Sequence, residues 1–384
     1  MKRNVLARRA ASAALAACMM FSLSAPALAA STDALLQQST AAKSAVSVLE
    51  EENGMQVDES VQDFDIIING QSVNSENYNN ILGGTLCYDI EEKTLKLKEG
   101  QFFNGALTIT APEDVSIDLE ADASHVVKGD LTVRGAKDVK VTKLAGGNAD
   151  AAIEGKAEIT CSGDVILKNL SGSFGDGRNL IKNGLTVYRA DTVTTEGGIG
   201  GETIINCTGD IKLGNEWGTT VSKLTVKSAN NVTVTSGSVN RSIGQDGAEI
   251  TCSGIVELDS YRYSNHGLGK VSFRQANDKP YVYFMAKSSE YAKSSEYKDS
   301  RITPIPETIE KRYLRIEPRE TYSITVKNGT AQVVGDTDGK LTTAFAGEKV
   351  TVSGENGNPG VTKFGGWKVI SPESFELTEE QKNT

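Results

Sequence analysis

The sequence has little of what most enzymes and nucleic-acid-binding proteins need. Its 384 residues include only two histidines, His125 and His266, and neither lies in a nucleophile motif. No two aspartates are adjacent, and no phrase pairs acids in the way that glycoside hydrolysis requires. The formal net charge is −10, which argues against a nucleic-acid partner or an anionic membrane surface. These absences predict a protein that is not an enzyme.

Long apolar runs are missing after residue 30, so no later segment is expected to span a membrane. At the start of the chain, basic Lys2 to Arg9 precede apolar Ala10 to Ala25, and Ala27-Leu28-Ala29 is an A-x-A cleavage site. This pattern predicts a signal peptide over residues 1–30 and a secreted or cell-surface protein. A lipoprotein signal is the alternative, because Leu15-Ala16-Ala17-Cys18 resembles a lipoprotein box. Removing residues 1–30, with four basic residues and no acid, takes the net charge from −10 to −14.

Between Gly105 and Phe284 a short apolar–polar–apolar phrase recurs eight times, at steps of 19 to 28 residues. Its β-branched residues and its alternation are typical of a half-buried strand. Most phrases are followed, after a polar turn, by a second such strand and are preceded by one more apolar residue. The phrases are Leu107-Thr108-Ile109, Leu131-Thr132-Val133, Ile159-Thr160-Cys161, Leu185-Thr186-Val187, Ile205-Asn206-Cys207, Leu224-Thr225-Val226, Ile250-Thr251-Cys252 and Val271-Ser272-Phe273.

A repeat of this size cannot bury its apolar face alone, whereas stacked repeats share one continuous core. A four-stranded propeller blade needs about 40 or more residues. A sandwich would not need one phrase to recur so often, and no segment here holds the period of a helical solenoid. We therefore expect an all-β fold, a right-handed parallel β-helix of about eight coils over residues 64–285.

Acidic residues precede the second strand of four repeats, at Asp114, Asp138, Asp164 and Asp210. Stacked coils would place such carboxylates about 4.8 Å apart. At that distance neighbours repel by about 3 kcal/mol at an effective dielectric near 20, and a bound Ca²⁺ would relieve the repulsion. Ordinary turn chemistry is the alternative, because Asp accepts backbone N–H groups and tolerates tight turns.

Four cysteines remain once residues 1–30 are removed. Cys161, Cys207 and Cys252 hold the same place in the phrase and are 46 and 45 residues apart, which is two repeats each time. Their Cα atoms should then lie about 9–10 Å apart. A disulfide needs about 4.4–6.8 Å, so we expect these three thiols to be unpaired and to face the core. With Cys87, the four do not have zinc-ligand spacing.

Aromatic residues are few, but several gather at the end of the repeat region. Tyr261, Tyr263, Tyr281 and Tyr283 would suit carbohydrate binding, because a tyrosine ring offers apolar area with a polar handle. The alternative is that these side chains close the last coil against water.

A family resemblance enters at residues 64–97. Phe64-Asp65-Ile66-Ile67-Ile68-Asn69-Gly70, then Tyr88-Asp89 and Thr94-Leu95-Lys96-Leu97, resembles the opening of a family of secreted bacterial β-helix proteins. Members of that family are labelled carbohydrate-binding and look like pectate lyases that have lost the catalytic site. The resemblance covers about residues 64–284. It implies a polysaccharide, or a glycan of a host or cell surface, as the partner.

The remaining segments flank this region. Residues 31–63 are interpreted as a polar leader or N-terminal cap, and residues 286–319 as a linker with exit strands. In residues 320–384, Ala346 to Val352 and Phe364 to Val369 resemble phrases of the divergent internalin-B-type repeat of bacterial surface proteins. Those repeats end with a further strand, so this one is expected to be incomplete.

These observations favour a non-catalytic secreted or surface β-solenoid that binds polysaccharide or acts as an adhesin. Two alternatives stay open: a structural stalk that displays other domains, and a divergent polysaccharide lyase or hydrolase. Calcium is the one possible cofactor, and the sequence indicates no oligomeric state.

Overall fold

The computed structural model shows an all-β chain. One short 3-10 turn, η1 (Ser289–Tyr291), accompanies the strands of the described residues. No helix in that part of the chain is long and apolar enough to cross a membrane. The structure describes residues 61–144, 150–171, 179–216, 218–237, 242–260, 267–291, 297–326, 329–345 and 348–354. The predicted signal peptide and most of the predicted leader lie outside these ranges and stay predictions.

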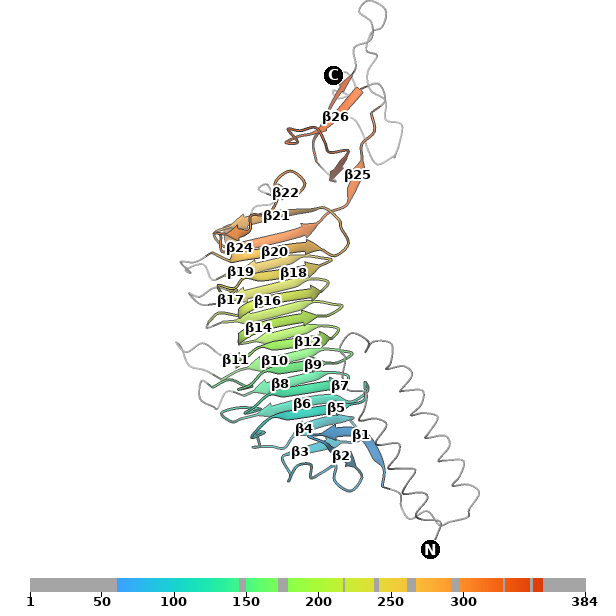
Figure 1. Cartoon of the computed structure of the whole chain (residues 1–384), viewed down its shortest axis with the longest axis vertical. Coiled ribbons are helices and arrows are strands. Elements are labelled where there is room, and N and C mark those ends of the chain that lie inside the picture. Colours follow the sequence, from blue (N-terminus) through green and yellow to red (C-terminus); the bar gives the residue numbers. More distant parts are fainter. Residues whose placement is uncertain are drawn as a thin grey trace, which may run out of the picture. The chain divides into compact units, whose positions relative to one another are not determined.

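Two long sheets of parallel strands make up the repeat region (Figure 1). What we call the first sheet stacks the strands that hold the phrases: β5 (Leu107–Ala111), β7 (Leu131–Gly135), β9 (Ala157–Thr160), β12 (Leu185–Arg189), β14 (Gly198–Asn206), β16 (Val221–Ser228), β18 (Ala248–Cys252) and β20 (Gly269–Gln275). The second sheet stacks the strands that alternate with them: β4 (Thr94–Leu97), β6 (Ser116–Ala121), β8 (Val139–Lys143), β10 (Val165–Asn169), β13 (Val193–Glu196), β15 (Ile211–Asn215), β17 (Val232–Ser236) and β19 (Val256–Asp259).

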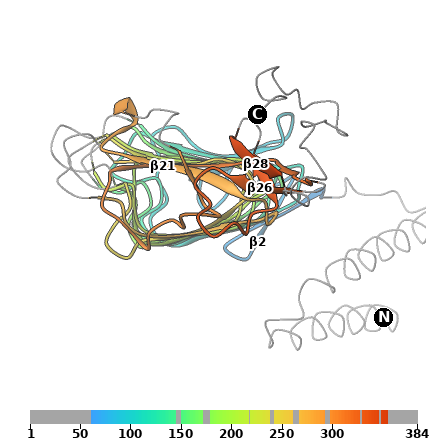
Figure 2. The ribbon, with the colours of Figure 1, turned by 90° about the horizontal axis from the view of Figure 1, so that it is seen from above.

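A third, narrower ladder closes each coil between the two sheets. It is formed by the apolar residue that precedes each phrase, together with β11 (Asn179–Ile181), which pairs with β14. Seen along the stack, successive coils overlie one another (Figure 2). The ladder confirms three strand-like pieces per repeat and runs through Phe103, Val127, Ile153, Ile181, Ile199, Val221 and Ile243.

Antiparallel strands cover both ends of the stack. At the N-terminal end, β1 (Asp63–Ile68) pairs with β5 and with β2 (Gln71–Asn74), and β3 (Leu86–Asp89) pairs with β4. At the other end, β24 (Tyr313–Pro318) lies between β19 and β21 (Tyr281–Ala286). Two short strands, β22 (Lys298–Asp299) and β23 (Thr308–Ile309), form the last pairs. Edge strands of two residues leave few unpaired backbone groups for another chain to join.

The stack has about seven turns and confirms the predicted parallel β-solenoid, for which about eight coils were expected. Eight phrases do form eight parallel strands in the first sheet. The last of them, β20, is not followed by a second parallel strand, because β24 runs antiparallel to β19. The final coil is therefore closed by the antiparallel cap.

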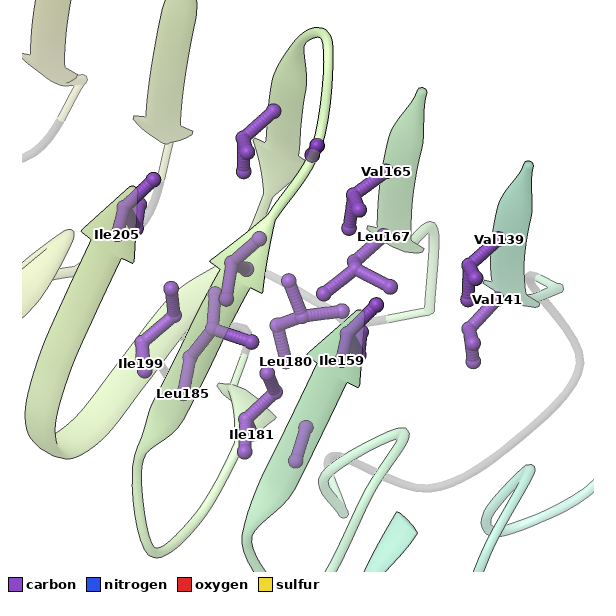
Figure 3. Packing of buried hydrophobic residues seen from close by; sticks show 14 of the residues in the cluster. Val139, Val141, Ile159, Val165, Leu167, Leu180, Ile181, Leu185, Ile199 and Ile205 are labelled. Atoms are coloured by element: carbon purple, nitrogen blue, oxygen red, sulfur yellow. The ribbon is translucent and has the colours of Figure 1, made fainter. Parts of the chain in front are cut away.

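The core is a continuous column of aliphatic side chains between the sheets (Figure 3). Ile159, Leu167 and Leu185 point inward from neighbouring strands and are fully buried. Fully burying one such side chain contributes about 1.5–3 kcal/mol. Because no single coil encloses this column, its stability depends on the stacking of neighbours.

Coils of two kinds alternate along the first sheet from β7 to β18. In what we call the leucine coils, β7, β12 and β16 carry Leu131, Leu185 and Leu224 at one core position, and an extra residue precedes a buried alanine. In the cysteine coils, β9, β14 and β18 carry a small residue at the position that pairs with these leucines. A buried cysteine takes the place of the buried alanine, and no extra residue precedes it. The paired positions, in order, are Leu131, Ala157, Leu185, Thr203, Leu224, Ala248 and Val271.

Beyond the stack, the described residues form two small antiparallel sheets. One pairs β25 (Thr321–Ser323) with β27 (Thr343–Phe345), and the other pairs β26 (Gly329–Val333) with β28 (Val350–Gly354). The phrase Phe364 to Val369, on which the internalin-type resemblance partly depends, lies outside the described residues.

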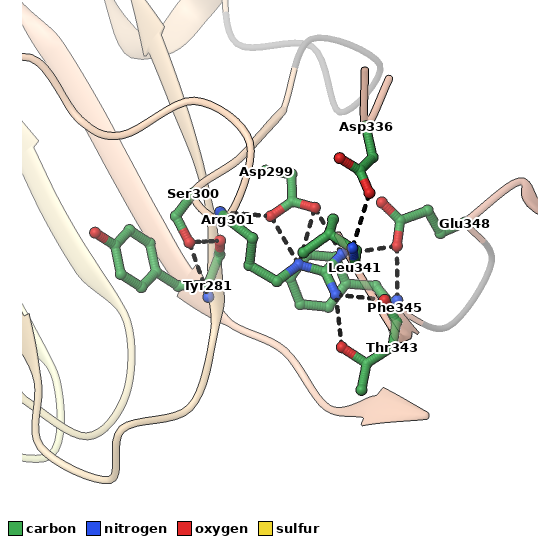
Figure 4. A network of polar contacts seen from close by, with 9 residues as sticks. All are labelled: Tyr281, Asp299, Ser300, Arg301, Asp336, Leu341, Thr343, Phe345 and Glu348. Carbon is green, nitrogen blue, oxygen red and sulfur yellow. Dashed lines mark hydrogen bonds and ion pairs between the residues drawn. The ribbon is translucent and has the colours of Figure 1, made fainter. Parts of the chain in front are cut away.

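Arg301 joins these small sheets to the exit segment of the stack (Figure 4). Its guanidinium donates to Asp299 Oδ2 at 2.6 Å and to Asp299 Oδ1 at 3.0 Å. It also donates to the Thr343 carbonyl at 2.8 Å and to Glu348 Oε2 at 2.9 Å. The same group lies 3.9 Å from the centre of the Phe345 ring. Because Arg301 is largely buried, these contacts are poorly screened by water.

Candidate functional site

The four predicted calcium ligands do not form one ladder. Asp138 lies opposite Asp164, but its partner in the preceding coil is Ser116, which leaves Asp114 two positions away. Thr192 separates Asp164 from Asp210 in the same way. Only one pair of carboxylates is therefore adjacent. Among the described residues, no three His, Cys, Asp or Glu side chains converge on a point that would hold a metal ion.

Each of these aspartates instead accepts a hydrogen bond or forms an ion pair with a neighbouring coil. Asp114 pairs with Lys93 at 2.6 Å, and this bond holds the pKa of Asp114 below its usual range. Asp164 accepts the Thr192 hydroxyl at 2.7 Å. Asp210 accepts the side-chain amides of Asn230 and Asn231 at 3.1 and 2.8 Å. This arrangement fits the alternative interpretation, turn chemistry.

Asp138 belongs to a recurring contact that we call a coil bridge. Its Oδ1 passes over Gly163 in the next coil and accepts the backbone N–H of Asp164 at 2.9 Å. A Cβ on Gly163 would lie 2.2 Å from that oxygen, so the bridge needs glycine there. Equivalent bridges join Asp130 to Lys156 over Gly155 and Asn231 to Ile255 over Gly254.

The predicted aromatic platform is only partly available. Tyr283 is fully buried, and its hydroxyl donates to the Pro304 carbonyl at 3.1 Å, so it cannot offer its ring to a sugar. Tyr281 is half-buried and packs edge-on against Phe273, with ring centres 4.9 Å apart. Burial raises the pKa of both tyrosines. These two residues close the last coil against water, and Tyr261 and Tyr263 lie outside the described residues.

The predicted thiols are confirmed as unpaired and buried. Cys161, Cys207 and Cys252 are free, and each Sγ lies 3.4–3.5 Å from the carbonyl oxygen of the glycine two residues later. Burial raises the pKa of each to about 11. A thiolate is the reactive form, so these cysteines are packing residues. Cys87 is free and partly exposed.

The outer face of the second sheet carries charges that are paired across coils. Lys140 lies 3.0 Å from Asp118 in the preceding coil, and Lys168 contacts Glu196 in the next. At the end of the stack Arg315 lies 3.3 Å from Glu257. Salt bridges at this exposure contribute little to stability, but they neutralise the face locally.

On the outer face of the first sheet Lys223 pairs with Glu202 across coils, and Arg189 pairs with Glu113, but three long basic side chains lack such a partner. Arg134, Lys227 and Arg274 are exposed, and no ion pair among the described residues involves them. Tyr188 stands in the same row and is 54% exposed. We call Arg134, Tyr188, Lys227 and Arg274 the outer row, since each directly follows the inward-facing residue of its phrase.

Hydroxyl groups line the position beside the outer row. Thr132, Thr225 and Ser272 are accessible at this position, and Thr186, their equivalent in β12, is buried. The strands between carry Glu158, Ile204 and Glu249 opposite these residues. The register shifts at Tyr188 and again near Lys227, which marks a β-bulge in β12 and in β16. A bulge re-aims side chains and often borders a binding site.

The outer row was not predicted from the three-residue phrases, although the sequence carries its signal. In the leucine coils Leu-Thr-Val is followed by two residues, the first of which is Arg134, Tyr188 or Lys227, and then by an alanine. In two cysteine coils Ala-Glu-Ile-Thr is followed directly by Cys161 or Cys252. An alignment restricted to three residues hides this difference. Extending the alignment by three residues would have separated the two kinds of coil.

No protein-family model, no curated protein and no solved structure matches the chain.

Proposed function

We propose that the chain is a non-catalytic, secreted or cell-surface β-solenoid that binds polysaccharide along the outer face of its first sheet. The observation that carries the proposal is the uneven use of side chains on the two faces. Several charges on the second sheet are paired across coils, whereas the first sheet presents the exposed Tyr188 and three exposed basic side chains without ion pairs among the described residues, with hydroxyls beside them in alternate coils.

This face has the form that an extended polar polymer needs. Eight parallel strands continue it without interruption, and hydroxyl residues recur at one register position in every second strand, alternating with Glu158, Ile204 and Glu249. Hydroxyl groups donate and accept hydrogen bonds, as sugar hydroxyls do. The exposed Tyr188 ring adds apolar area on which a sugar ring can stack. The family resemblance of residues 64–284 to carbohydrate-binding β-helix proteins points the same way.

The test is retardation of the purified chain in native gels that contain one polysaccharide each. We expect at least one glycan to retard the chain and Tyr188→Ala to weaken its binding by about threefold or more, because a well-placed aromatic contributes about 0.5–1.5 kcal/mol. Tyr322→Ala is the matched control, since Tyr322 is 52% exposed but lies in β25. Unchanged mobility of the wild-type chain across the panel would refute the proposal.

A structural stalk is the second candidate function. The contacts of Arg301 with Thr343, Phe345 and Glu348 favour it, because they hold the small sheets to the end of the stack. In this proposal the small sheets are the start of an internalin-B-type repeat that the solenoid displays. Two results together would fit the stalk. No glycan would retard the chain, and protease would release the small sheets from the Arg301→Ala variant but not from the wild type.

A further inference from the structure

The outer row has a period of two coils. Arg134, Tyr188, Lys227 and Arg274 come from β7, β12, β16 and β20, and one strand separates each from the next. The strands between them carry the short polar residues Thr160, Asn206 and Thr251. Thr160 pairs with Arg134 and Thr251 with Arg274, whereas the bulges place Arg189 opposite Thr160 and Ser228 opposite Asn206, beside Tyr188 and Lys227. Neighbouring strands lie about 4.7–4.9 Å apart, so the long side chains recur about every 9–10 Å.

Three members of this row are cations in a chain whose net charge is −10. Glu158 pairs with Lys156 and Glu202 with Lys223, each at 2.7 Å. The exposed Glu249 of β18, the strand between those of Lys227 and Arg274, forms no ion pair with a described residue. Three cations against this one unpaired acid leave the row with a local excess of positive charge. A solvent-exposed cation without a partner attracts an anionic ligand at little desolvation cost.

We propose that the ligand of this face is a linear glycan that carries a carboxylate or sulfate on every second sugar. Lys227 and Arg274 bind anionic groups one repeat apart, Arg134 binds one two repeats from Lys227, and Tyr188 stacks on a sugar of the repeat between Arg134 and Lys227. The proposal rests on the proposed function and adds the class of polysaccharide. An extended disaccharide unit repeats over a distance comparable to two coils, so each cation of the row meets an anionic sugar while the short residues leave room for the neutral one.

The experiment compares glycans that differ in charge but not in backbone. Hyaluronan carries a carboxylate on alternate sugars, and hyaluronan with its carboxylates reduced to alcohols is the neutral control. Keratan sulfate offers sulfate in place of carboxylate and shows which anion the row prefers. We expect hyaluronan, keratan sulfate or both to retard the full chain, and we expect the carboxyl-reduced polymer to bind at least tenfold more weakly than hyaluronan where hyaluronan binds.

Variants then test the residues. Lys227→Ala and Arg274→Ala should each weaken binding about two- to fivefold, as expected for an exposed charge pair, and the triple variant with Arg134→Ala should weaken it more than tenfold. Lys212→Ala is the matched control, because Lys212 is exposed on the second sheet and forms no ion pair with any described residue. It should bind like the wild type.

A charge-preserving variant tests the spacing itself. Lys227→Thr combined with Thr251→Lys keeps three cations but moves one of them into the coil next to Arg274. We expect this variant to bind as weakly as Lys227→Ala. Wild-type affinity would show that charge matters and its spacing does not, which would overturn the inference.

The outcomes separate the two proposals. Equal binding of hyaluronan and its carboxyl-reduced form, with keratan sulfate no better, would overturn the anionic-glycan inference and leave the polysaccharide proposal standing. If a neutral glycan retards the wild type and none of these polymers does, the anionic-glycan inference is likewise overturned and the polysaccharide proposal stands. Absence of binding to every glycan would overturn both.

Discussion

The coil bridge of Asp138 makes a quantitative prediction about how neighbouring coils hold together. Asp138 Oδ1 accepts the N–H of Asp164 at 2.9 Å by passing over Gly163. A Cβ at residue 163 would lie 2.2 Å from this oxygen and 2.9 Å from the Lys137 carbonyl oxygen. Gly163→Ala must therefore displace the carboxylate and also press on the backbone of the preceding coil.

The energy of each part follows from the geometry. A hydrogen bond to a charged group contributes about 1.5–3 kcal/mol, which we reduce to about 1 kcal/mol because the Asp138 side chain is 38% exposed. Overpacking against the Lys137 carbonyl adds about 1–2 kcal/mol. Gly163→Ala should thus lower the free energy of unfolding by about 2–3 kcal/mol, and Asp138→Ala by about 1 kcal/mol.

The double variant decides whether the two residues form one unit. In the Asp138→Ala background the carboxylate is already gone, so Gly163→Ala loses only the overpacking part. The double variant should be destabilised by about 2–3 kcal/mol in total, about 1 kcal/mol less than the sum of the singles.

Urea unfolding of the four proteins measures this coupling through the midpoint at constant slope. Gly214→Ala is the control, because a Cβ there would meet its nearest neighbour, Thr235 Oγ1, at 3.4 Å, an ordinary contact. It should change the free energy of unfolding by less than about 0.5 kcal/mol. Strict additivity of Asp138→Ala and Gly163→Ala would refute the bridge.

Three further predictions follow from buried groups. The core thiols, whose pKa burial raises to about 11, should resist alkylation in the folded chain at about pH 8 while Cys87 reacts, and mass spectrometry showing Cys161 labelled as fast as Cys87 would contradict this. Burial raises the pKa of Asp259 above its value in the unfolded chain, so its ionised form destabilises the fold at neutral pH. Asp259→Asn, which can still accept the Ser289 hydroxyl, should raise the melting temperature at about pH 7, with a gain that shrinks as acidification protonates the wild-type carboxyl; an equal gain at every pH would refute this sign. Thr203 Oγ1 is buried without a hydrogen-bond partner among the described residues, so Thr203→Val should stabilise the chain by about 1 kcal/mol in thermal unfolding, and a lower melting temperature would show that the hydroxyl is satisfied.

The repeat architecture could be predicted because alternation determines which side of a strand faces the core. The phrase at Leu185 needs its first and third residues inside, and both are buried in β12. The same logic predicted the two-coil separation of Cys161 and Cys207, which Ala190 fills between them. The end of the stack was harder, since a strand such as β24 has the same alternation whether it adds in parallel or antiparallel.

The site was predicted less well, because the alternation of apolar and polar residues along a strand does not indicate which segments cover the face that points away from the core. Tyr281 and Tyr283 are two residues apart and project from the same face of β21, yet Tyr283 is buried under the exit segment at Pro304. Val282 and Phe284, on the opposite side of β21, are buried as well. Both faces of this strand are covered by segments that follow it in the chain, and no local pattern encodes that cover.

The period of the outer row has its origin in the core. At one core position Leu131, Leu185 and Leu224 alternate with small residues in register, whereas the next inward position holds a large side chain in every coil.

The leucine coils also use a buried alanine after an extra residue, where the cysteine coils use a buried cysteine directly. That extra residue changes the register at Tyr188 and near Lys227 and exposes the pair of residues at the strand end. Because the packing of the core imposes the alternation, the spacing of the cations outside is as rigid as the stack itself. A ligand that matches two coils therefore meets a face whose geometry is already set before it binds, and ordering that face on binding costs little free energy.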